Sequence, residues 1–229
     1  MTTMHLLLTA WVADPFALAV ALAALLGWGV GIRRGSAPRA GYVVAALAVF
    51  LLALISPIGV LARGYLFSAH MLQHLLLLLV VPPLALLALP AARIPTVLPP
   101  TPALPAPPAK AGRELLAWLA GAGAMWLWHA PALCDAAGRI LAVQRVQTLS
   151  LLAAGTAFWW PIFAPYARAR LAPFAAILYL FTACIACTVL GVLVTFSPVQ
   201  VCSIYMHPAD TLGVLPLLRD RWGLGPAAD

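Results

Sequence analysis

The sequence predicts an all-α fold, a polytopic bundle of about six membrane-spanning helices that forms a single domain over residues 1–229. Hydrophobic residues make up 64% of the chain and charged residues only 8%, whereas about a quarter of the residues in a soluble domain are charged. Apolar runs of about 20 residues, the length that crosses a bilayer, recur along the chain. Loops marked by Pro, Gly or Arg separate them. The lipid bilayer is therefore the first expected partner.

Six apolar runs have the length of a spanning helix. They cover residues 15–32, 41–57, 66–89, 114–130, 147–164 and 172–196. Asp14 stands before Pro15, where its carboxylate is expected to cap the first helix. No basic segment precedes this first run, and the run leads directly into Arg33 and Arg34. This arrangement favours a retained helix over a cleaved signal peptide.

Prolines interrupt the pattern in two places. Pro82 and Pro83 lie within the third span and should kink or break it, because neither can donate a backbone hydrogen bond. The loop at about 90–113 contains PPTPALPAPPAK, a composition typical of an extended, semi-rigid connector. We expect this connector on the inner side of the membrane.

The basic residues predict the orientation, because inner loops carry more Lys and Arg than outer loops. With the N-terminus outside, eight basic residues fall inside and five outside. The inner set is Arg33, Arg34, Arg39, Arg93, Lys110, Arg113, Arg168 and Arg170, and the outer set is Arg63, Arg139, Arg145, Arg219 and Arg221. We therefore expect both termini outside. The net charge of +7 reflects topology and not a nucleic-acid surface.

Histidines within the spans are the main functional signal. His70 and His74 lie four residues apart on one face of the third span, and His129 ends the fourth. Ionisable side chains inside a bilayer are functional candidates by default, and imidazole is a common ligand of copper, zinc and iron. We predict a metal site of these three histidines. The alternative is that each only forms a hydrogen bond across a helix interface, for about 0.6 kcal/mol.

Other ligand types fall on the same predicted side. Cys134, Met206 and His207 are expected to contact a metal on its way into the site. Cys134 and Cys202 could instead pair, since disulfides persist outside the cell, but the sequence gives no distance between them. The chain has no Gly-rich phosphate loop, no Ser/His/Asp arrangement and no acidic pair inside a span. We therefore expect a protein that is not an enzyme.

Several motifs resemble one family. FSAHMLQHLLLLLVVPPLALLALP, WLWHAPALCDAA and AAGTAFWWPIFAP occur in the order and spacing of the CtaG family of cytochrome c oxidase assembly factors, and VLGVLVTFSP and RWGLGPAAD resemble its later segments. The resemblance covers most of the chain from about residue 66. It implies a protein of the bacterial inner membrane that helps to build a haem–copper oxidase of the respiratory chain and handles copper on the outer face. An oxidase subunit and periplasmic copper chaperones would be its partners.

Individual residues carry this resemblance. His70, His74 and His129 match the histidines of the family, and Asp135 matches an acidic position after WLWHAP. The chain departs from the pattern at Gln144 and Thr148, where family members often carry further histidines. The family pattern also continues past RWGLGPAAD into another span. We therefore expect either a missing seventh helix or a divergent end.

Four hypotheses follow from these observations. The first is an assembly factor that binds copper transiently and presents it to an oxidase subunit. The second is a haem-binding or quinone-reactive electron-transfer protein with histidines as axial ligands. The third is a transporter of small solutes or metal ions, and the fourth is a scaffold in which the histidines only join helices.

Overall fold

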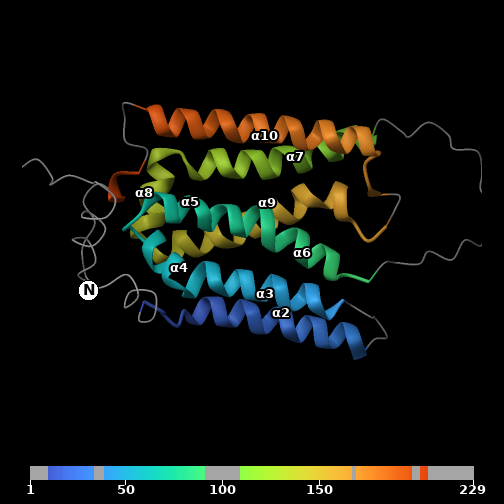
Figure 1. Cartoon of the computed structure of the whole chain (residues 1–229), viewed down its shortest axis with the longest axis horizontal. Helices are drawn as coiled ribbons and strands as arrows, with labels where there is room; N and C mark the ends of the chain where they lie inside the picture. The colour runs from blue at the N-terminus through green and yellow to red at the C-terminus, as the bar shows by residue number, and fades with distance from the viewer. Residues whose placement is uncertain (1–9, 34–38, 91–108, 167–168, 198–201, 206–229) are drawn as a thin grey trace, which may run out of the picture.

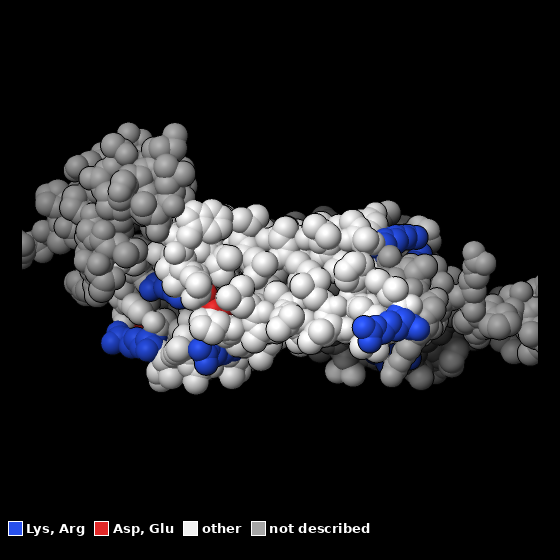
Figure 2. Space-filling view, turned by 90° about the horizontal axis from the view of Figure 1, so that it is seen from below, with Lys and Arg blue, Asp and Glu red and all other residues white. Residues whose placement is uncertain are grey.

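The chain is all-α, as predicted. The computed structural model describes residues 10–33, 39–90, 109–166, 169–197 and 202–205, and these ranges contain helices and no strand. The long helices run side by side along one axis (Figure 1). Basic side chains gather at the two ends of the bundle, and the long middle of the face shown in Figure 2 is uncharged. A bilayer requires this distribution, because charge at its centre is costly.

Each predicted span corresponds to a helix. The helices are α2 (Pro15–Arg33), α3 (Ala40–Ile55), α5 (Phe67–Leu75) continued by η1 (Leu76–Val80) and α6 (Val81–Ala88), α7 (Ala109–Trp128), α9 (Leu141–Phe163) and α10 (Pro173–Phe196). Among the described residues, α2, the continuous helix Phe67–Ala88, α9 and α10 are long and apolar enough to cross a membrane. Of the others, α3 is apolar but has 16 residues, and α7 carries Arg113 and Glu114 near its start.

Some predicted boundaries are wrong where polar residues lie inside a helix. α9 begins at Leu141 and not at 147, so the polar residues Gln144 and Arg145 lie inside the helix and not in the loop before it. α7 begins at Ala109, so the predicted loop at 90–113 extends too far; residues 91–108 lie outside the described ranges. Two short helices, α4 (Pro57–Ala62) and α8 (Pro131–Arg139), replace predicted loops.

The start of α2 confirms the predicted cap. The Asp14 carboxylate accepts a hydrogen bond from the backbone N–H of Phe16 at 2.9 Å. The same carboxylate accepts a second bond from the guanidinium of Arg63 at 2.6 Å. Asp14 therefore fixes the start of α2 and joins it to the end of α4.

The two prolines of the third span do not end the helix. A π-helical turn, η1, precedes them, and the N–H of Val81 donates to the carbonyl of Leu76 five residues earlier. The carbonyl of Leu78 would normally accept from residue 82 in an α-helix or residue 83 in a π-helix. Both residues are proline and have no N–H. Of the predicted kink or break, the break is wrong, because another helix supplies a donor to this carbonyl.

That donor comes from α9. The indole N–H of Trp159 donates to the Leu78 carbonyl at 3.2 Å. Gly155, one turn earlier on α9, makes the approach possible: a Cβ there would lie 2.6 Å from the Leu78 oxygen and 2.6 Å from Pro82 Cγ. Neighbouring helices commonly satisfy backbone groups freed by proline in membranes. We call Leu78, Pro82 and Pro83 the proline turn.

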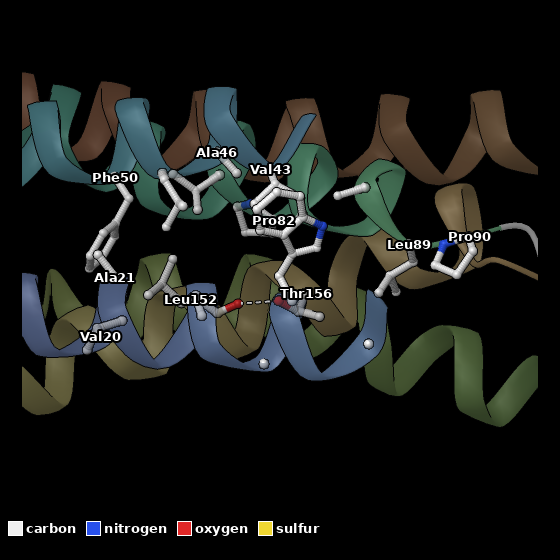
Figure 3. A pocket seen from close by; sticks show the side chains of 18 residues that line it. Val20, Ala21, Val43, Ala46, Phe50, Pro82, Leu89, Pro90, Leu152 and Thr156 are labelled. Carbon is white, nitrogen blue, oxygen red and sulfur yellow. Dashed lines mark hydrogen bonds between the residues drawn. The ribbon is translucent and has the colours of Figure 1, made fainter. Parts of the chain in front are cut away.

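The hydrophobic core lies between α3, η1, α6, α7 and α9, and α2 and α10 pack against it as the two flanks (Figure 1). A cavity of about 450 Å³ lies between α2, α3, α6 and α9 (Figure 3). Phe50, Pro82 and Leu152 are among the apolar side chains that line it. The hydroxyl of Thr156 donates to the Leu152 carbonyl at 2.7 Å. None of the described lining residues is ionisable, so the cavity offers hydrocarbon surface and no acid–base or metal-binding group.

Candidate functional site

The three predicted histidines meet at one end of the bundle, where α5 begins and α7 ends; we call it the histidine end. His70 and His74 project from consecutive turns of α5, and His129 follows the last residue of α7. All three are buried, with exposed fractions of 5%, 1% and 4%. The ring centroids of His70 and His74 are 4.1 Å apart, and those of His129 lie 6.4 Å from His70 and 5.6 Å from His74.

Hydrogen bonds to the helix backbone fix two of the rings. Nδ1 of His74 donates to the carbonyl of His70 at 2.8 Å, and Nδ1 of His129 donates to the carbonyl of Met125 at 2.6 Å. A carbonyl only accepts, so the proton lies on Nδ1 and the lone pair on Nε2. Among the described residues, Nε2 of His74 and Nε2 of His70 are buried and have no hydrogen-bond partner.

A thioether joins the cluster. Sδ of Met71 lies 2.8 Å from Nε2 of His129. Met71 is the neighbour of His70 on α5 and is partly buried. Sequence reasoning missed it, because a methionine in an apolar helix normally fills the core. The only available signal was its place beside a histidine within the motif AHMLQH.

Aromatic rings pack against the cluster. The ring of Tyr205 lies 5.5 Å from that of His70 and 5.5 Å from that of Phe67. Phe67 in turn contacts the rings of His70 at 6.1 Å and His129 at 6.3 Å. The Tyr205 hydroxyl donates to the Ala62 carbonyl at 2.6 Å. Burial raises the pKa of the Tyr205 phenol above its ordinary value, so the hydroxyl keeps its proton and remains a donor.

Tyr205 belongs to η3 (Ser203–Tyr205), a short 3-10 turn that is tied to α8. A disulfide joins Cys134 of α8 to Cys202, with their Cα atoms 5.5 Å apart. The sequence left Cys134 as either a metal contact or a partner of Cys202. The structure has the pair, and a sulfur in a disulfide is not the thiolate that binds metals. We call residues 202–205 the tethered segment.

Asp135 anchors the same segment. Its carboxylate accepts hydrogen bonds from the Ser203 hydroxyl at 3.0 Å and from the Ile204 N–H at 3.3 Å. Arg139 also donates to the Ser203 hydroxyl at 3.1 Å. Gly138 leaves room for this contact, since a Cβ there would lie 2.8 Å from Ile204 Cδ1. Asp135 therefore holds the tethered segment, whose Tyr205 ring packs against His70.

The remaining sequence candidates lie elsewhere. Gln144 and Thr148 stand where family members often carry further histidines. The Thr148 hydroxyl donates to the Gln144 carbonyl within α9, so these two residues form a local contact on that helix. Met206 and His207 lie outside the described residues.

The donor chemistry of the cluster can be compared with what a metal needs. Among the described residues, no three His, Cys, Asp or Glu side chains are placed so that they hold an ion as they stand. Two buried ring nitrogens, Nε2 of His70 and Nε2 of His74, are nevertheless unpartnered. Ligating histidines typically donate their other N–H to a carbonyl, the arrangement observed at His74 and His129. The residues therefore suit a cation that accepts nitrogen and sulfur lone pairs.

Comparison with known proteins gives one finding. Residues 22–228 match the family model described as cytochrome c oxidase caa3 assembly factor (Caa3_CtaG). No curated protein matches the chain, and no solved structure does. The match covers the histidine end, the proline turn and the tethered segment.

Proposed function

This chain belongs to the cytochrome c oxidase caa3 assembly factor family, and from that premise we propose that it binds copper at the histidine end and passes it to a subunit of a haem–copper oxidase. The family membership implies association with the oxidase. The apolar helices agree with a protein of the membrane. Copper is the cargo in this proposal, with His70, His74 and His129 as its ligands.

The observation that carries the proposal is the pair of buried, unpartnered Nε2 atoms of His70 and His74. A buried polar atom without a partner costs about 1–3 kcal/mol. Because this cost applies at two adjacent positions, a purely structural explanation would need a compensating gain. A copper ion that accepts both lone pairs would supply it.

The scaffold hypothesis has less support. Histidines that joined helices would form hydrogen bonds from one helix to another. His74 and His129 instead donate to carbonyls of their own turns, four residues earlier. These bonds orient the rings and add nothing to the contact between α5 and α7.

The haem hypothesis also has less support. A haem needs a flat space the width of a porphyrin between or beside its axial histidines. The rings of His70 and His74 are 4.1 Å apart, and Phe67 and Tyr205 pack against His70. This crowding favours a single ion over a macrocycle. The apolar cavity of Figure 3 lacks ionisable groups among its described residues and therefore does not favour quinone chemistry.

The proposal includes an orientation. The chain lies in the bacterial inner membrane with its N-terminus and its histidine end outside, where periplasmic copper chaperones would deliver the ion. The disulfide between Cys134 and Cys202 supports this side, because disulfides persist in the periplasm and are rare in the cytosol.

Metal analysis with an optical spectrum tests the proposal. The full chain, purified in detergent from copper-replete cells, should carry near-stoichiometric copper and no Soret band. His70→Ala and His74→Ala should each lose copper. Gln73→Ala is the matched control, because Gln73 is also buried on α5 but donates to the Ala53 carbonyl of α3 at 2.7 Å. Copper that remains in both histidine variants would refute the proposed ligands, and a Soret band lost in them would favour haem.

A further inference from the structure

We propose that the thioether of Met71 is a fourth donor of this site, and that it makes copper(I) the form of the metal that the site selects. The inference rests on the proposed function, since it concerns the same three histidines. It adds a ligand that sequence reasoning did not identify, and it specifies the oxidation state of the cargo.

The contact between Met71 and His129 is the first step. Nδ1 of His129 donates to the Met125 carbonyl at 2.6 Å, so in the neutral ring Nε2 carries a lone pair. Sδ of Met71, 2.8 Å from Nε2, carries lone pairs and no hydrogen. Two lone-pair atoms at this distance repel each other unless a proton or a cation is shared between them.

A proton is the poorer solution. It would make His129 an imidazolium, a charge buried at 4% exposure beside two further imidazoles. A buried charge needs an opposite charge or strong hydrogen bonds to offset its desolvation, and a thioether is only a weak acceptor. A soft cation accepts the nitrogen and sulfur lone pairs together and removes the repulsion.

Charge and softness select copper(I). Imidazole and thioether are neutral donors, and thioether sulfur favours copper(I) over hard or borderline ions. The described carboxylates are engaged or distant: Asp14 pairs with Arg63, Asp135 holds the tethered segment, and Glu114 lies 15 residues before His129, about 22 Å along α7. Desolvation cost rises with the square of the charge, so a divalent ion costs about four times as much to bury as a monovalent ion without anionic ligands.

Met71 is suited to admit the ion. It has three rotatable bonds and is only partly buried. Its side chain can therefore move back by the roughly 1 Å that separates a direct nitrogen–sulfur contact from one in which both atoms bind the same ion. His74 and His129 lack this freedom, because hydrogen bonds to the backbone fix their rings.

A competition titration tests the inference. The full chain in detergent is titrated with copper(I) against bicinchoninate, without oxygen and with ascorbate, which leaves the disulfide intact. Met71→Leu keeps the volume and removes the sulfur; it should lower copper(I) affinity by about ten- to a hundredfold, the range for losing a group that supports a metal site. Met125→Leu is the matched control, because Met125 is buried in the core and its hydrogen bond with His129 involves the backbone carbonyl, which the substitution keeps. It should bind as the wild type does.

Two further measurements separate the outcomes. X-ray absorption at the copper edge should show copper–sulfur scattering in the wild type and in Met125→Leu, and none in Met71→Leu. Zinc(II) affinity should be the same in Met71→Leu and the wild type. Equal copper(I) affinities for the wild type and Met71→Leu would overturn the role of Met71 and leave the histidine proposal standing. Equal losses of copper(I) and zinc(II) affinity would overturn the selectivity. A wild type that binds no copper would overturn both proposals.

Discussion

Replacement of Gly155 by alanine should weaken the contact between α9 and the proline turn. The added Cβ would lie 2.6 Å from the Leu78 oxygen, 2.6 Å from Pro82 Cγ and 3.1 Å from Leu78 Cα. Ordinary contacts of a Cβ begin at 3.4 Å, so the overlap with the oxygen is about 0.8 Å (3.4 − 2.6). Two of these neighbours are backbone atoms and the third belongs to a proline ring. None of them can rotate away, and α9 itself must move.

The magnitude follows from three contributions. Overpacking of a well-packed core costs about 1–3 kcal/mol. Movement of α9 also stretches the 3.2 Å bond from Trp159 to the Leu78 carbonyl, whose loss costs about 0.6 kcal/mol in a membrane. Alanine recovers about 0.5–1 kcal/mol because it is a better helix former than glycine. The net loss in the free energy of unfolding should be roughly 1–3 kcal/mol.

Unfolding in mixed micelles with increasing dodecyl sulfate, followed by far-ultraviolet circular dichroism, measures this loss. Gly123→Ala on α7 is the control, since a Cβ at Gly123 would have no neighbour within 4 Å. It should be as stable as the wild type or slightly more stable. If Gly155→Ala and Gly123→Ala unfold at the same detergent composition, the close approach of α9 does not limit stability and the reasoning is wrong.

Two further predictions concern the tethered segment. Of its four cysteines, the denatured but unreduced protein should show two as reactive thiols, and all four only after reduction, because Cys134 and Cys202 are paired. Four reactive thiols before reduction would contradict the pairing. Asp135→Ala should speed hydrogen exchange at the Ile204 amide by about fivefold, since one hydrogen bond is worth about 1 kcal/mol. Mass spectrometry of the peptide measures this rate, and an unchanged rate would show that Asp135 does not anchor the segment.

The parts of the site that follow local rules could be predicted from the sequence. The four-residue spacing of His70 and His74 places both on one face of a helix whatever surrounds it. Consecutive spans tend to be neighbours, which made His129 a reasonable third member. The Asp14 cap is also local, because its acceptor lies two residues from the donor. The resemblance to the family rested on the same histidine motifs.

The remaining features depend on partners that are distant in sequence. Pro82 predicts a kink or a break when its own helix is considered alone, but Trp159 donates to the carbonyl of Leu78, 81 residues before it. Nothing in the apolar run around Met71 indicates a ligand, because its partner His129 lies 58 residues further on. Asp135 matched an acidic position of the family motif, but its role as an anchor could not be predicted, because its partners lie 68 and 69 residues further on. No periodicity in the sequence records such pairings.

The bond between Cys134 and Cys202 also constrains how the chain is threaded through the bilayer. The two residues are separated by 68 positions, and the chain between them contains α9 and α10, each long and apolar enough to cross a membrane. A covalent bond joins only points on the same side, so the number of crossings between them must be even. Two crossings satisfy this parity. A chain in which only α9 had crossed would hold the two cysteines on opposite sides of the bilayer, so the disulfide excludes that half-threaded form.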